Sequence, residues 1–300
     1  MQISADSVTA VIPVYNGASR LRRSIDSVLA QTAPPAEVIV VDDGSKDDSA
    51  AIAESYGGIV RCVRQPNGGV ASARNHGLRE ARTDWVALLD HDDQWLPPKL
   101  ERQVAALRAK PESRICYTAF WVYWPNGSHH KSFVPPEDIW PGIRTRNPFP
   151  PSVVMLHRTS ALELGGFDER LKGASCEDWD FFVRFLADHP VTAVDEPMAN
   201  YFVESTSGSR DYRLMLKNTL SIMDRSLLSG LTGVQRALWR RRIKSAIYHQ
   251  VAVSARDWGE PSLEFSMESL KQWPLPGGAK RRVKTLLVGV RDAVLKKPGK

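Results

Sequence analysis

Three carboxylates and an imidazole follow one another directly after a short apolar run. Asp90, His91, Asp92 and Asp93 come after residues 85–89, which read Trp-Val-Ala-Leu-Leu. In an extended backbone, Asp90 and Asp92 share one face while His91 points the other way. Neighbouring carboxylates repel each other unless a cation joins them, and a hard divalent cation also binds phosphate oxygens. We therefore expect a metal site at Asp90 and Asp92, with His91 as a local contact; a solvated acidic turn is the alternative.

A second acidic pair, Asp42 and Asp43, follows the apolar residues 38–41 and precedes Gly44. Such carboxylates can accept hydrogen bonds from a nucleobase N–H group or a ribose hydroxyl. An Asp-Gly turn that only ends a strand has the same sequence. The pair by itself therefore leaves a nucleotide contact and a simple turn both open.

Two glycines, Gly68 and Gly69, precede the helical pattern of residues 70–81, and Arg74 lies one turn inside it. Glycine lets the backbone approach a ligand closely, and a helix N-terminus favours a phosphate. A flexible loop beside an ordinary surface arginine has the same sequence. The chain has no G-x-x-x-x-G-K-[ST] motif and no G-x-G-x-x-G after its first strand, which argues against ATPases and Rossmann dehydrogenases.

A third acidic group lies at residues 177–180, where Glu177, Asp178 and Asp180 surround Trp179. Acids are common in the first turn of a helix, because they cap its N–H groups and interact favourably with its dipole. A carboxylate beside a bound acceptor can instead take a proton as general base. Like-charged neighbours would make that carboxylate more basic. The residues alone do not choose between these roles.

The elements that must position these residues alternate between strands and helices. Apolar β-branched runs predict strands at residues 8–14, 38–41, 59–63 and 85–89, and helical spacing predicts helices at residues 21–29, 47–55 and 70–81. This alternation is typical of a parallel sheet with helices on its faces. Ligands of such sheets bind at the carboxyl ends of the strands, where the first three motifs fall.

The pattern after residue 98 is less regular. It predicts helices at residues 99–109 and near 179–187, and strands at residues 115–124, 153–157 and 191–194. Residues 125–150 are rich in proline and aromatic residues, so we expect an irregular lid or substrate wall there. Beyond about residue 210 the pattern becomes helical and basic.

Bulk composition is that of a soluble globular protein, with 42% hydrophobic and 25% charged residues. The net charge of +6 suggests an anionic partner, but no recognisable nucleic-acid-binding module accompanies it, so nucleic acid is not expected. Three cysteines without a C-x-x-C spacing argue against a disulfide framework and a zinc site. The sequence shows no signal peptide and no apolar run of about 18 residues. We therefore expect a cytoplasmic protein, and this expectation includes a place at the inner face of the membrane.

The motifs occur in the order found in one large family. Between about residues 8 and 205 the chain carries V-I-P-V-Y-N at 11–16, V-D-D-G-S at 41–45, N-G-G leading to A-R-N at 67–75, L-D-H-D-D at 89–93, and G-G-F-D-E at 165–169 ahead of E-D-W at 177–179. Each motif is weak alone, but together and in this order they are specific. The chain resembles the inverting glycosyltransferases of family 2, which have the GT-A fold.

The resemblance implies an α/β fold of the GT-A type, a Rossmann-like and mostly parallel sheet flanked by helices. It implies a catalytic domain over residues 1–210, with a nucleotide-sugar half at about 1–110 and an acceptor half at about 111–210. Residues 211–300 would form a basic helical C-terminal extension.

The resemblance also implies roles for single residues. The nucleotide contacts would be Pro13, Tyr15, Asp42, Asp43, Asn67, Gly68, Arg74 and Asp90. The metal, Mn²⁺ or Mg²⁺, would bind Asp92 with Asp90 beside it. Asp178 would be the catalytic base, with Glu177 as the substitute. The acceptor contacts would be Gly166, Phe167 and Trp179.

The chemistry that the resemblance implies is one displacement at an anomeric carbon. The acceptor hydroxyl would lose its proton to Asp178 and attack opposite the leaving nucleoside diphosphate, usually UDP, so that the configuration inverts. A divalent cation would neutralise charge on the leaving group. Hexosyltransferases of this kind serve bacterial cell-surface polysaccharide or lipid-linked glycan synthesis, with glycan or lipid-linked acceptors.

Two departures from the family pattern bear on these expectations. Many relatives carry Tyr-Arg followed closely by His at the end of the catalytic domain, where this chain has Y-F-V-E-S at 201–205. A diphosphate or metal contact is therefore missing or is replaced by Glu204. The Q-x-x-R-W motif and the membrane helices of processive members are also absent from the sequence, which favours transfer of a single sugar.

The basic C-terminal region has two amphipathic patterns. Apolar residues recur at helical spacing over 239–247 and 283–294, and each pattern has basic residues beside it, at 240–244 and 280–284. A basic amphipathic helix can rest on an anionic membrane, which suits a lipid-linked acceptor. Apolar faces that pack on the rest of the protein give the same periodicity, so both interpretations stay open.

Two other functions also stay open at this point. A sugar-nucleotide pyrophosphorylase has a similar sheet and acidic metal site, but its glycine-rich basic loop after the first strand is replaced here by P-V-Y-N-G at 13–17. The second alternative is a catalytically silent glycan-binding or scaffold protein of the same fold. The retained D-x-D and Glu-Asp pairs argue against it.

Overall fold

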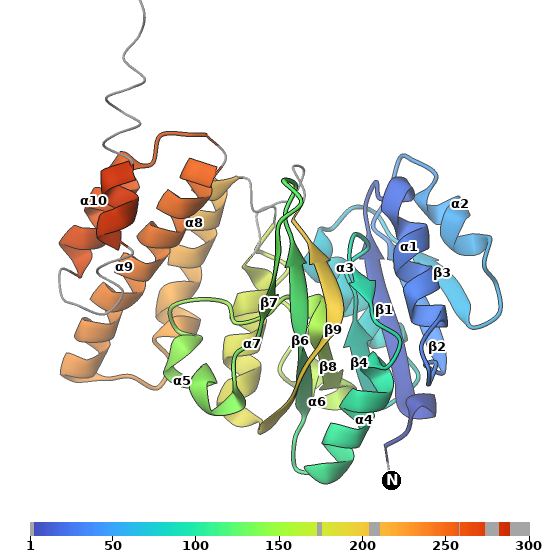
Figure 1. Ribbon diagram of the computed structural model, residues 1–300. Coiled ribbons are helices and arrows are strands. Elements are labelled where there is room, and N and C mark those ends of the chain that lie inside the picture. The colour runs from blue at the N-terminus through green and yellow to red at the C-terminus, as the bar shows by residue number, and fades with distance from the viewer. Residues whose placement is uncertain (1–2, 173–175, 204–210, 258, 274–281, 289–300) are drawn as a thin grey trace, which may run out of the picture. The chain divides into compact units, whose positions relative to one another are not determined.

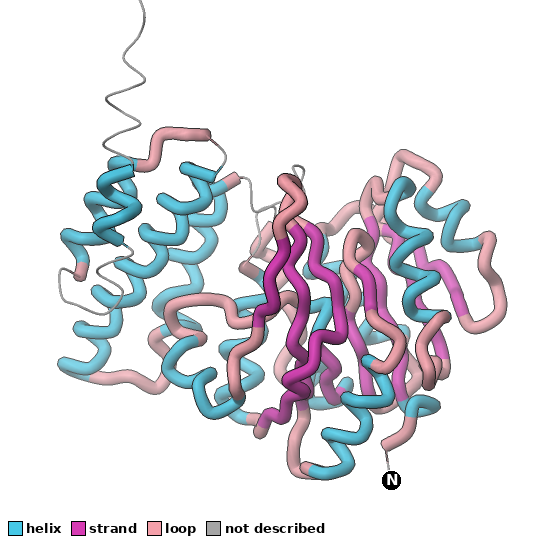
Figure 2. Tube along the Cα trace, in the orientation of Figure 1, coloured by secondary structure: helices cyan, strands magenta, loops and turns pink. Residues whose placement is uncertain are grey.

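The computed structural model describes residues 3–172, 176–203, 211–257, 259–273 and 282–288 (Figure 1). The chain divides into two compact units. The first unit comprises Met1–Ile139, Pro148–Lys172 and Arg184–Glu204, and the second comprises Trp140–Asn147, Gly173–Val183 and Ser205–Lys300. Every strand in the described residues belongs to the first unit, while the elements of the second are helical (Figure 2).

The sheet begins with four parallel strands in the order β3-β2-β1-β4. Their bounds are β1 Val8–Val14, β2 Glu37–Asp42, β3 Val60–Arg64 and β4 Trp85–Leu88, joined through α1 Ala18–Leu29, α2 Ser49–Glu54 and α3 Val70–Glu80. The central strands are buried on both faces, which explains why they read as continuous β-branched runs instead of alternating patterns.

The chain reverses its direction across the sheet after β3. The first two crossovers step from β1 to β2 and β3, and α3 then returns the chain to the far side of β1. Because such crossovers are right-handed, α1 and α2 cover one face of the sheet and α3 covers the other, as Figure 1 shows for α1 and α3. The reversal makes a topological switch point at the carboxyl ends of β1 and β4, where ligands of open α/β sheets bind.

The rest of the sheet is mixed. Its elements are β5 Gln94–Trp95, α4 Lys99–Ala109, β6 Ile115–Tyr123, β7 His129–Ser132, β8 Val154–His157, α6 Arg158–Glu163 and β9 Val191–Phe202. β8 joins β4 antiparallel, β6 pairs antiparallel with β8 and β7, and β9 runs parallel to β6. β5 pairs antiparallel with β9.

Two predictions for this half of the chain need correction. The segment 125–150 is not irregular throughout, since it contains β7, a 3-10 turn at Pro136–Asp138 and the short helix α5 Ile139–Gly142. β7 carries polar, mostly exposed side chains, so it has no apolar pattern to reveal it. β9 extends to Phe202 instead of ending near residue 194, because its pairing with β6 resumes after a bulge around Pro197.

The second unit is built from α8 Tyr212–Ile222, a π-helical turn at Met223–Leu227, α9 Gly233–Asp257 and α10 Leu263–Gln272. It also contains the first residues of α7 Glu177–Asp188. α9 packs against α8 and α10, and Ile243 and Ile247 are buried there. The apolar side of the first amphipathic pattern therefore includes core residues of this unit.

The second amphipathic pattern is only partly described. Residues 282–288 are helical, and Val283 and Leu287 are exposed. Lys280, Arg281, Val290 and Val294 lie outside the described residues. No described helix combines the length and the apolar character needed to cross a membrane.

Candidate active site

The acidic loop Asp90–Asp93 lies at the switch point, directly after β4. Its backbone turns, with the N–H of Asp93 donating to the carbonyl oxygen of Asp90 at 3.0 Å. The expectation of an extended backbone at these residues is therefore wrong, because Asp93 is drawn into the interior. Asp93 is fully buried, whereas Asp90 and Asp92 are both partly exposed.

Helix α1 holds the backbone of this loop. The Ser24 hydroxyl lies 2.7 Å from the carbonyl oxygens of both His91 and Asp93, and the Arg23 guanidinium donates to the carbonyl oxygen of Asp92. The His91 ring packs against the backbone at the start of the helix, since a Cβ on Gly17 would lie 2.3 Å from its Cδ2 atom. His91 is therefore a packing contact of the loop.

Asp93 is a structural residue. Its Oδ2 atom accepts a hydrogen bond from the Ser152 hydroxyl at 2.5 Å, and its Oδ1 atom accepts one from the backbone N–H of Phe202 at 3.0 Å. Burial raises the pKa of the Asp93 carboxyl well above its usual range, and the charges of Asp92 and Asp90 add to the rise. The side chain thereby joins the acidic loop to β9 and to the 3-10 turn Pro151–Val153.

Asp90 and Asp92 have different surroundings. Asp90 forms an ion pair with Arg74, whose Nη2 atom lies 2.7 Å from the Asp90 Oδ1 atom and whose side chain is only 4% exposed. The Arg74 guanidinium also lies over the Phe167 ring, 5.4 Å from its centre. Burial raises the pKa of the Asp92 carboxyl, and the nearby Asp90 charge adds to the rise. Arg74 thus neutralises Asp90, while the surroundings of Asp92 disfavour its negative charge.

A divalent cation fits this pair only together with a ligand. In the parts of the chain that the structure describes, no group of three or more His, Cys, Asp and Glu side chains is arranged to hold a metal. Mg²⁺ typically binds one or two carboxylates and completes its shell with water and substrate phosphates. Asp92, with Asp90 beside it, suits a cation that arrives with a diphosphate better than a permanently bound one.

Asp43 anchors the glycine loop that precedes α3. Its carboxylate accepts hydrogen bonds from the backbone N–H groups of Gly68 and Gly69, both at 2.8 Å, and from the Gln65 amide at 2.7 Å. Asp42 is also buried and accepts a hydrogen bond from the Ser45 N–H at 3.2 Å. Both acids therefore shape the carboxyl edge of β2, and the exposed Asn67 stands at the outer end of the loop they hold.

The loop after β1 lies beside the loop after β2. Pro13 is buried within β1, and Tyr15 is 43% exposed just beyond its end. Asn16 has a φ of 51°, in the left-handed region that few non-glycine residues adopt. Its N–H donates to the Ser45 hydroxyl at 2.9 Å, and its side-chain oxygen accepts from the Lys46 N–H at 2.8 Å. Sequence reasoning gave Asn16 no role, although asparagine before glycine is a signal for this conformation.

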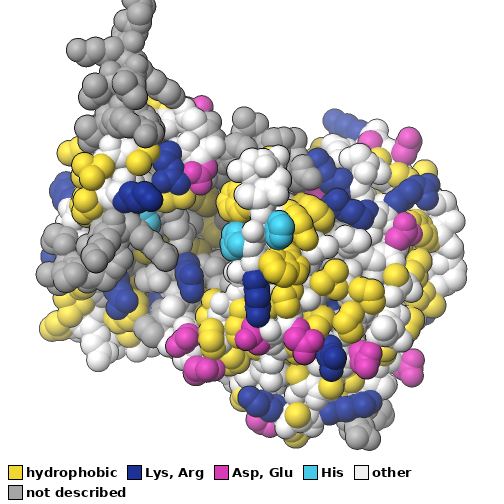
Figure 3. Space-filling model, viewed as in Figure 1, with side chains coloured by type: hydrophobic (Ala, Val, Ile, Leu, Met, Phe, Trp, Pro, Cys, Tyr) yellow, Lys and Arg dark blue, Asp and Glu magenta, His cyan; other side chains and the backbone are white. Residues whose placement is uncertain are grey.

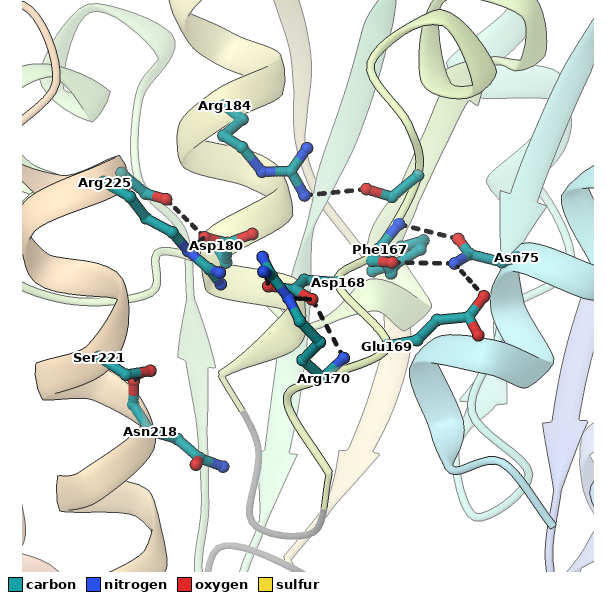
Figure 4. Close-up of polar contacts among 12 residues, drawn as sticks. Asn75, Phe167, Asp168, Glu169, Arg170, Asp180, Arg184, Asn218, Ser221 and Arg225 are labelled. Carbon is teal, nitrogen blue, oxygen red and sulfur yellow. Dashed lines mark hydrogen bonds and ion pairs between the residues drawn. The ribbon is translucent and has the colours of Figure 1, made fainter.

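The turn at Gly165–Glu169 is held from two helices (Figure 4). From α3, the Asn75 side chain accepts from the Phe167 N–H and donates to the Phe167 carbonyl oxygen, both at 2.8 Å. From α7, the Arg184 guanidinium donates to the carbonyl oxygen of Gly166 at 2.8 Å. A Cβ on Gly166 would lie 2.3 Å from the Asn75 Oδ1 atom, and its φ of 68° is left-handed. The predicted acceptor residues Gly166 and Phe167 are thus rigidly placed, and Asn75 and Arg184 were missed.

The acids at the start of α7 belong to the second unit and differ in exposure. Glu177 and Asp180 are buried, with 3% and 1% of their surface exposed, whereas Asp178 is partly exposed. Asp180 accepts from the Ser226 hydroxyl at 2.5 Å and pairs with Arg225 at 3.4 Å (Figure 4). Glu177 accepts from the Cys176 N–H at 3.1 Å. Of these three acids, Asp178 is therefore the one that solvent can reach.

The Asp178 carboxylate is oriented by its neighbours. Its Oδ2 atom accepts from the Asn147 side-chain amide at 2.8 Å, and its Oδ1 atom accepts from the Trp179 N–H at 2.7 Å. Trp179 is buried, and its indole N–H donates to the Ile143 carbonyl oxygen at 2.6 Å. Asn147 was missed because nothing in the local sequence connects it with residue 178. The predicted nucleotide and metal residues thus gather in the first unit, and Asp178, Glu177 and Trp179 lie in the second.

Comparison with known families gives a consistent result. The family model described as Glycosyl transferase family 2 matches residues 9–164, more than half of the chain, and one described as Glycosyltransferase like family 2 matches residues 143–219. A Rickettsia typhi protein named uncharacterized glycosyltransferase RT0329 is 35% identical over 187 residues, which are 60% of this chain and 58% of that protein. The chain therefore spans little more than half of that relative.

A second relative is EpsE of Bacillus subtilis, named as a glycosyltransferase. It is 30% identical over 193 residues, which are 62% of this chain and 68% of that protein. Two solved structures share the fold. Mannosyltransferase PcManGT from Pyrobaculum calidifontis, in complex with GDP-Man and Mn²⁺, has a TM-score of 0.61 at 19% identity over 97% of this chain and 86% of that one. S. aureus TarS 1-349, in complex with UDP-GlcNAc, has a TM-score of 0.57 at 16% identity over 98% of this chain and 93% of that one.

Proposed function

The chain belongs to glycosyl transferase family 2 and has the GT-A fold, and on this premise we propose that it moves a single sugar from a UDP-sugar to an acceptor hydroxyl with inversion of configuration. The acceptor is a glycan or a lipid-linked glycan, and the pathway is bacterial-type cell-surface polysaccharide or lipid-linked glycan synthesis. Donor, stereochemistry, pathway and residue roles are all parts of this proposal.

The acidic loop at the switch point carries the proposal. Asp90 and Asp92 are partly exposed, while the third acid, Asp93, is committed to the interior. The loop lies where an open α/β sheet binds its ligands. A nucleoside diphosphate would bring the negative charge and phosphate oxygens that a cation on Asp92 needs to complete its shell.

The nucleoside part of the donor is assigned to the neighbouring loops. Tyr15 offers an exposed aromatic ring after β1. Asp42 and Asp43 fix the end of β2, and Gly68 and Asn67 lie in the loop that Asp43 anchors. Asp90, paired with Arg74, would contact the ribose. The likeness to a structure solved with UDP-GlcNAc is compatible with uridine but does not choose it over guanosine, which the other neighbour binds.

Asp178 is the proposed base. It accepts the proton of the acceptor hydroxyl while that oxygen attacks the anomeric carbon, and the bond from that carbon to the diphosphate oxygen breaks on the opposite face. Two hydrogen bonds, from Asn147 and from the Trp179 N–H, hold its carboxylate in place. Glu177 remains the substitute, although it is buried.

A Mn²⁺ or Mg²⁺ ion held by Asp92 and Asp90 would supply positive charge to the leaving diphosphate. The protein's own residues prepare for this charge. Arg74 neutralises Asp90, and Ser24 and Arg23 fix the backbone of the loop. No protein acid is then required at the leaving group.

The first test is thermal stability with UDP, GDP, dTDP or CMP, each with and without Mn²⁺. A ligand at a hundred times its dissociation constant adds about 2.7 kcal/mol to the unfolding free energy. We expect UDP to stabilise the protein only with Mn²⁺, and Asp92→Asn to remove this effect. Ser132→Ala, on β7, is the matched surface control.

The outcomes separate the parts of the proposal. Stabilisation by GDP instead of UDP changes the donor and leaves the metal site intact. Stabilisation that persists in Asp92→Asn removes that residue from the metal site. If no nucleotide stabilises the protein with any metal, the catalytically silent alternative becomes the better explanation.

A further inference from the structure

The outward face of the β6–β7 hairpin carries a row of aromatic rings. Tyr123 on β6 lies opposite Phe202 on β9 and His129 on β7. The ring centres are 5.2 Å apart for Tyr123 and Phe202 and 5.3 Å apart for Tyr123 and His129, and both pairs are nearly parallel. The next row toward the start of β6 has Trp121 opposite Asn200, with Trp121 edge-on to His129 at 5.6 Å. We call these five side chains the aromatic platform.

The platform belongs to the accessible face of the sheet. Phe120 and Val122 point to the opposite face and are buried, whereas Trp121 and Tyr123 are partly exposed and His129 is exposed. Figure 3 shows histidine and hydrophobic side chains side by side over this hairpin. Aromatic side chains packed together at the surface of a soluble protein usually mark a binding site, because burying them would otherwise be favourable.

The platform is continuous with the acidic loop. The Phe202 N–H donates to Asp93, and the Phe202 ring lies 4.0 Å beneath the Arg23 guanidinium, which itself donates to the Asp92 carbonyl oxygen. Asn200 donates to Gln94, the residue after Asp93, at 3.3 Å. Whatever binds the platform therefore lies on a surface that begins at the proposed donor site.

The chemistry of the platform suits a neutral sugar chain. A pyranose ring has a C–H face, which packs on an aromatic ring through its electron-rich surface, and hydroxyl groups, which bind amides and imidazoles. Trp121, Tyr123, Asn200 and His129 supply both kinds of partner. The cations at its two ends are already engaged, since Lys131 pairs with Asp195 at 2.7 Å and Arg23 binds the loop. A polyanion or an anionic lipid surface has little charge to meet here.

We propose that the aromatic platform of Trp121, Tyr123, His129, Asn200 and Phe202 is a glycan-binding subsite, which holds sugar units of the acceptor chain beyond the unit that reacts. This inference rests on the proposed glycosyltransferase function. It predicts that acceptor affinity grows with chain length until the platform is covered. A single exposed sugar unit would bind weakly, because it reaches one ring at a time.

Saturation-transfer NMR with the full chain tests the proposal. The probes are hexasaccharides of glucose in α and β linkage, of mannose and of N-acetylglucosamine. We expect at least one to bind at millimolar concentration or below, and Trp121→Ala to weaken it at least tenfold. Trp121→Phe keeps a ring and should stay within about threefold of the wild type, as an aromatic contact requires. Trp140→Ala removes an exposed tryptophan elsewhere and is the control.

Several results would overturn the proposal. One is the failure of all four hexasaccharides to bind. Another is unchanged glycan binding by a Trp121→Ala variant that has the wild-type melting temperature. A third is displacement of the glycan by UMP without metal, which would assign the rings to a nucleobase. Tyr123→Leu keeps the apolar volume and provides a second variant if Trp121→Ala does not fold. Nucleotide stabilisation of the wild type is measured in parallel, so loss of the donor assignment and loss of the platform give different results.

Discussion

Two acidic clusters in this chain look alike in sequence and are built alike in three dimensions. The loop at Asp90–Asp93 and the start of α7 each contain three acids within four residues. Each holds an acid fully in the interior, Asp93 or Asp180, where a serine hydroxyl donates to it at 2.5 Å, and the start of α7 buries Glu177 as well. Each also leaves partly exposed carboxylates, Asp90 and Asp92 in one cluster and Asp178 in the other. The number of acids in a segment therefore indicates a candidate site, while burial distinguishes the structural acids from those that a ligand can contact.

The clusters differ in how the buried charge is balanced. Asp180 has a cation, Arg225, at 3.4 Å, whereas Asp93 is held by Ser152 and a backbone N–H and lies near two further carboxylates. Arg225 thus compensates the buried charge of the second cluster, whereas in the first cluster the cation, Arg74, pairs with the partly exposed Asp90.

The largest expected effect separates the exposed acid of α7 from its buried neighbour. Asp178→Asn should lower donor turnover by about 10³-fold, as loss of a general base typically does, and should keep nucleotide stabilisation. Glu177→Gln should stay within about tenfold, because that carboxylate is buried. Release of nucleoside diphosphate measures both. A larger loss in Glu177→Gln would exchange the roles of the two acids.

The next effect concerns the buried acid of the same helix. Asp180→Ala should lower the unfolding free energy by about 2 kcal/mol, because Ser226 and Arg225 lose a buried partner. Asp178→Ala should cost less than about 1 kcal/mol, since that side chain is partly exposed. Urea denaturation followed by circular dichroism compares them. Equal losses would contradict the assignment of structural and exposed acids.

The two serines sharpen the comparison further. Ser152→Ala should cost about 1.5 kcal/mol and Ser226→Ala about 1 kcal/mol. The difference arises because the Ser152 hydroxyl also accepts from the Asp90 N–H at 3.1 Å, so its removal leaves more than one group unsatisfied. Denaturation midpoints under identical conditions measure the order. The reverse order would mean that Arg225 contributes little to holding Asp180.

A buried base gives an effect that appears only as a dependence of stability on pH. Lys99 is fully buried, with its Nζ atom 2.7 Å from Gln103 and 4.1 Å from the centre of the Trp95 ring. Burial lowers its pKa from 10.5 to about 7. The unfolded chain therefore binds more protons between these values, and the unfolding free energy rises with pH in that window, by about 1 kcal/mol per pH unit from this residue. The difference in unfolding free energy between the wild type and Lys99→Met, measured by urea denaturation at pH 7, 8 and 9, should show this slope. A difference that does not change with pH would contradict the prediction.

The first half of the fold could be predicted because its signals are local. Strand β1 and helix α4 have the predicted bounds, since buried parallel strands and regular helical spacing are both visible in short windows. The later strands could not be predicted in the same way. β7 is a polar edge strand, and the length of β9 depends on pairing with β6 after a bulge.

The residues of the candidate site also differ in whether their signals are local in the sequence. Asp90, Asp92 and Asp178 could be chosen by residue type and position after an element boundary. Asn147, Asn75 and Arg184 could not, because each acts on residues between 18 and 92 positions away in the chain. The sequence also could not tell that Asp93 is internal, because its partners Ser152 and Phe202 come from distant elements.

The bulge in β9 decides which side chains of the rest of the strand face outward. Between the pairs Thr118–Val194 and Trp121–Asn200, β6 advances three residues while β9 advances six. β9 therefore contains three more residues than β6 over this stretch. Because three is an odd number, the inward and outward positions of the later β9 residues are exchanged. Deleting one residue near Pro197 would turn Tyr201 and Val203 outward in place of Asn200 and Phe202. Length variants of this segment should therefore survive in evolution mainly in steps of two.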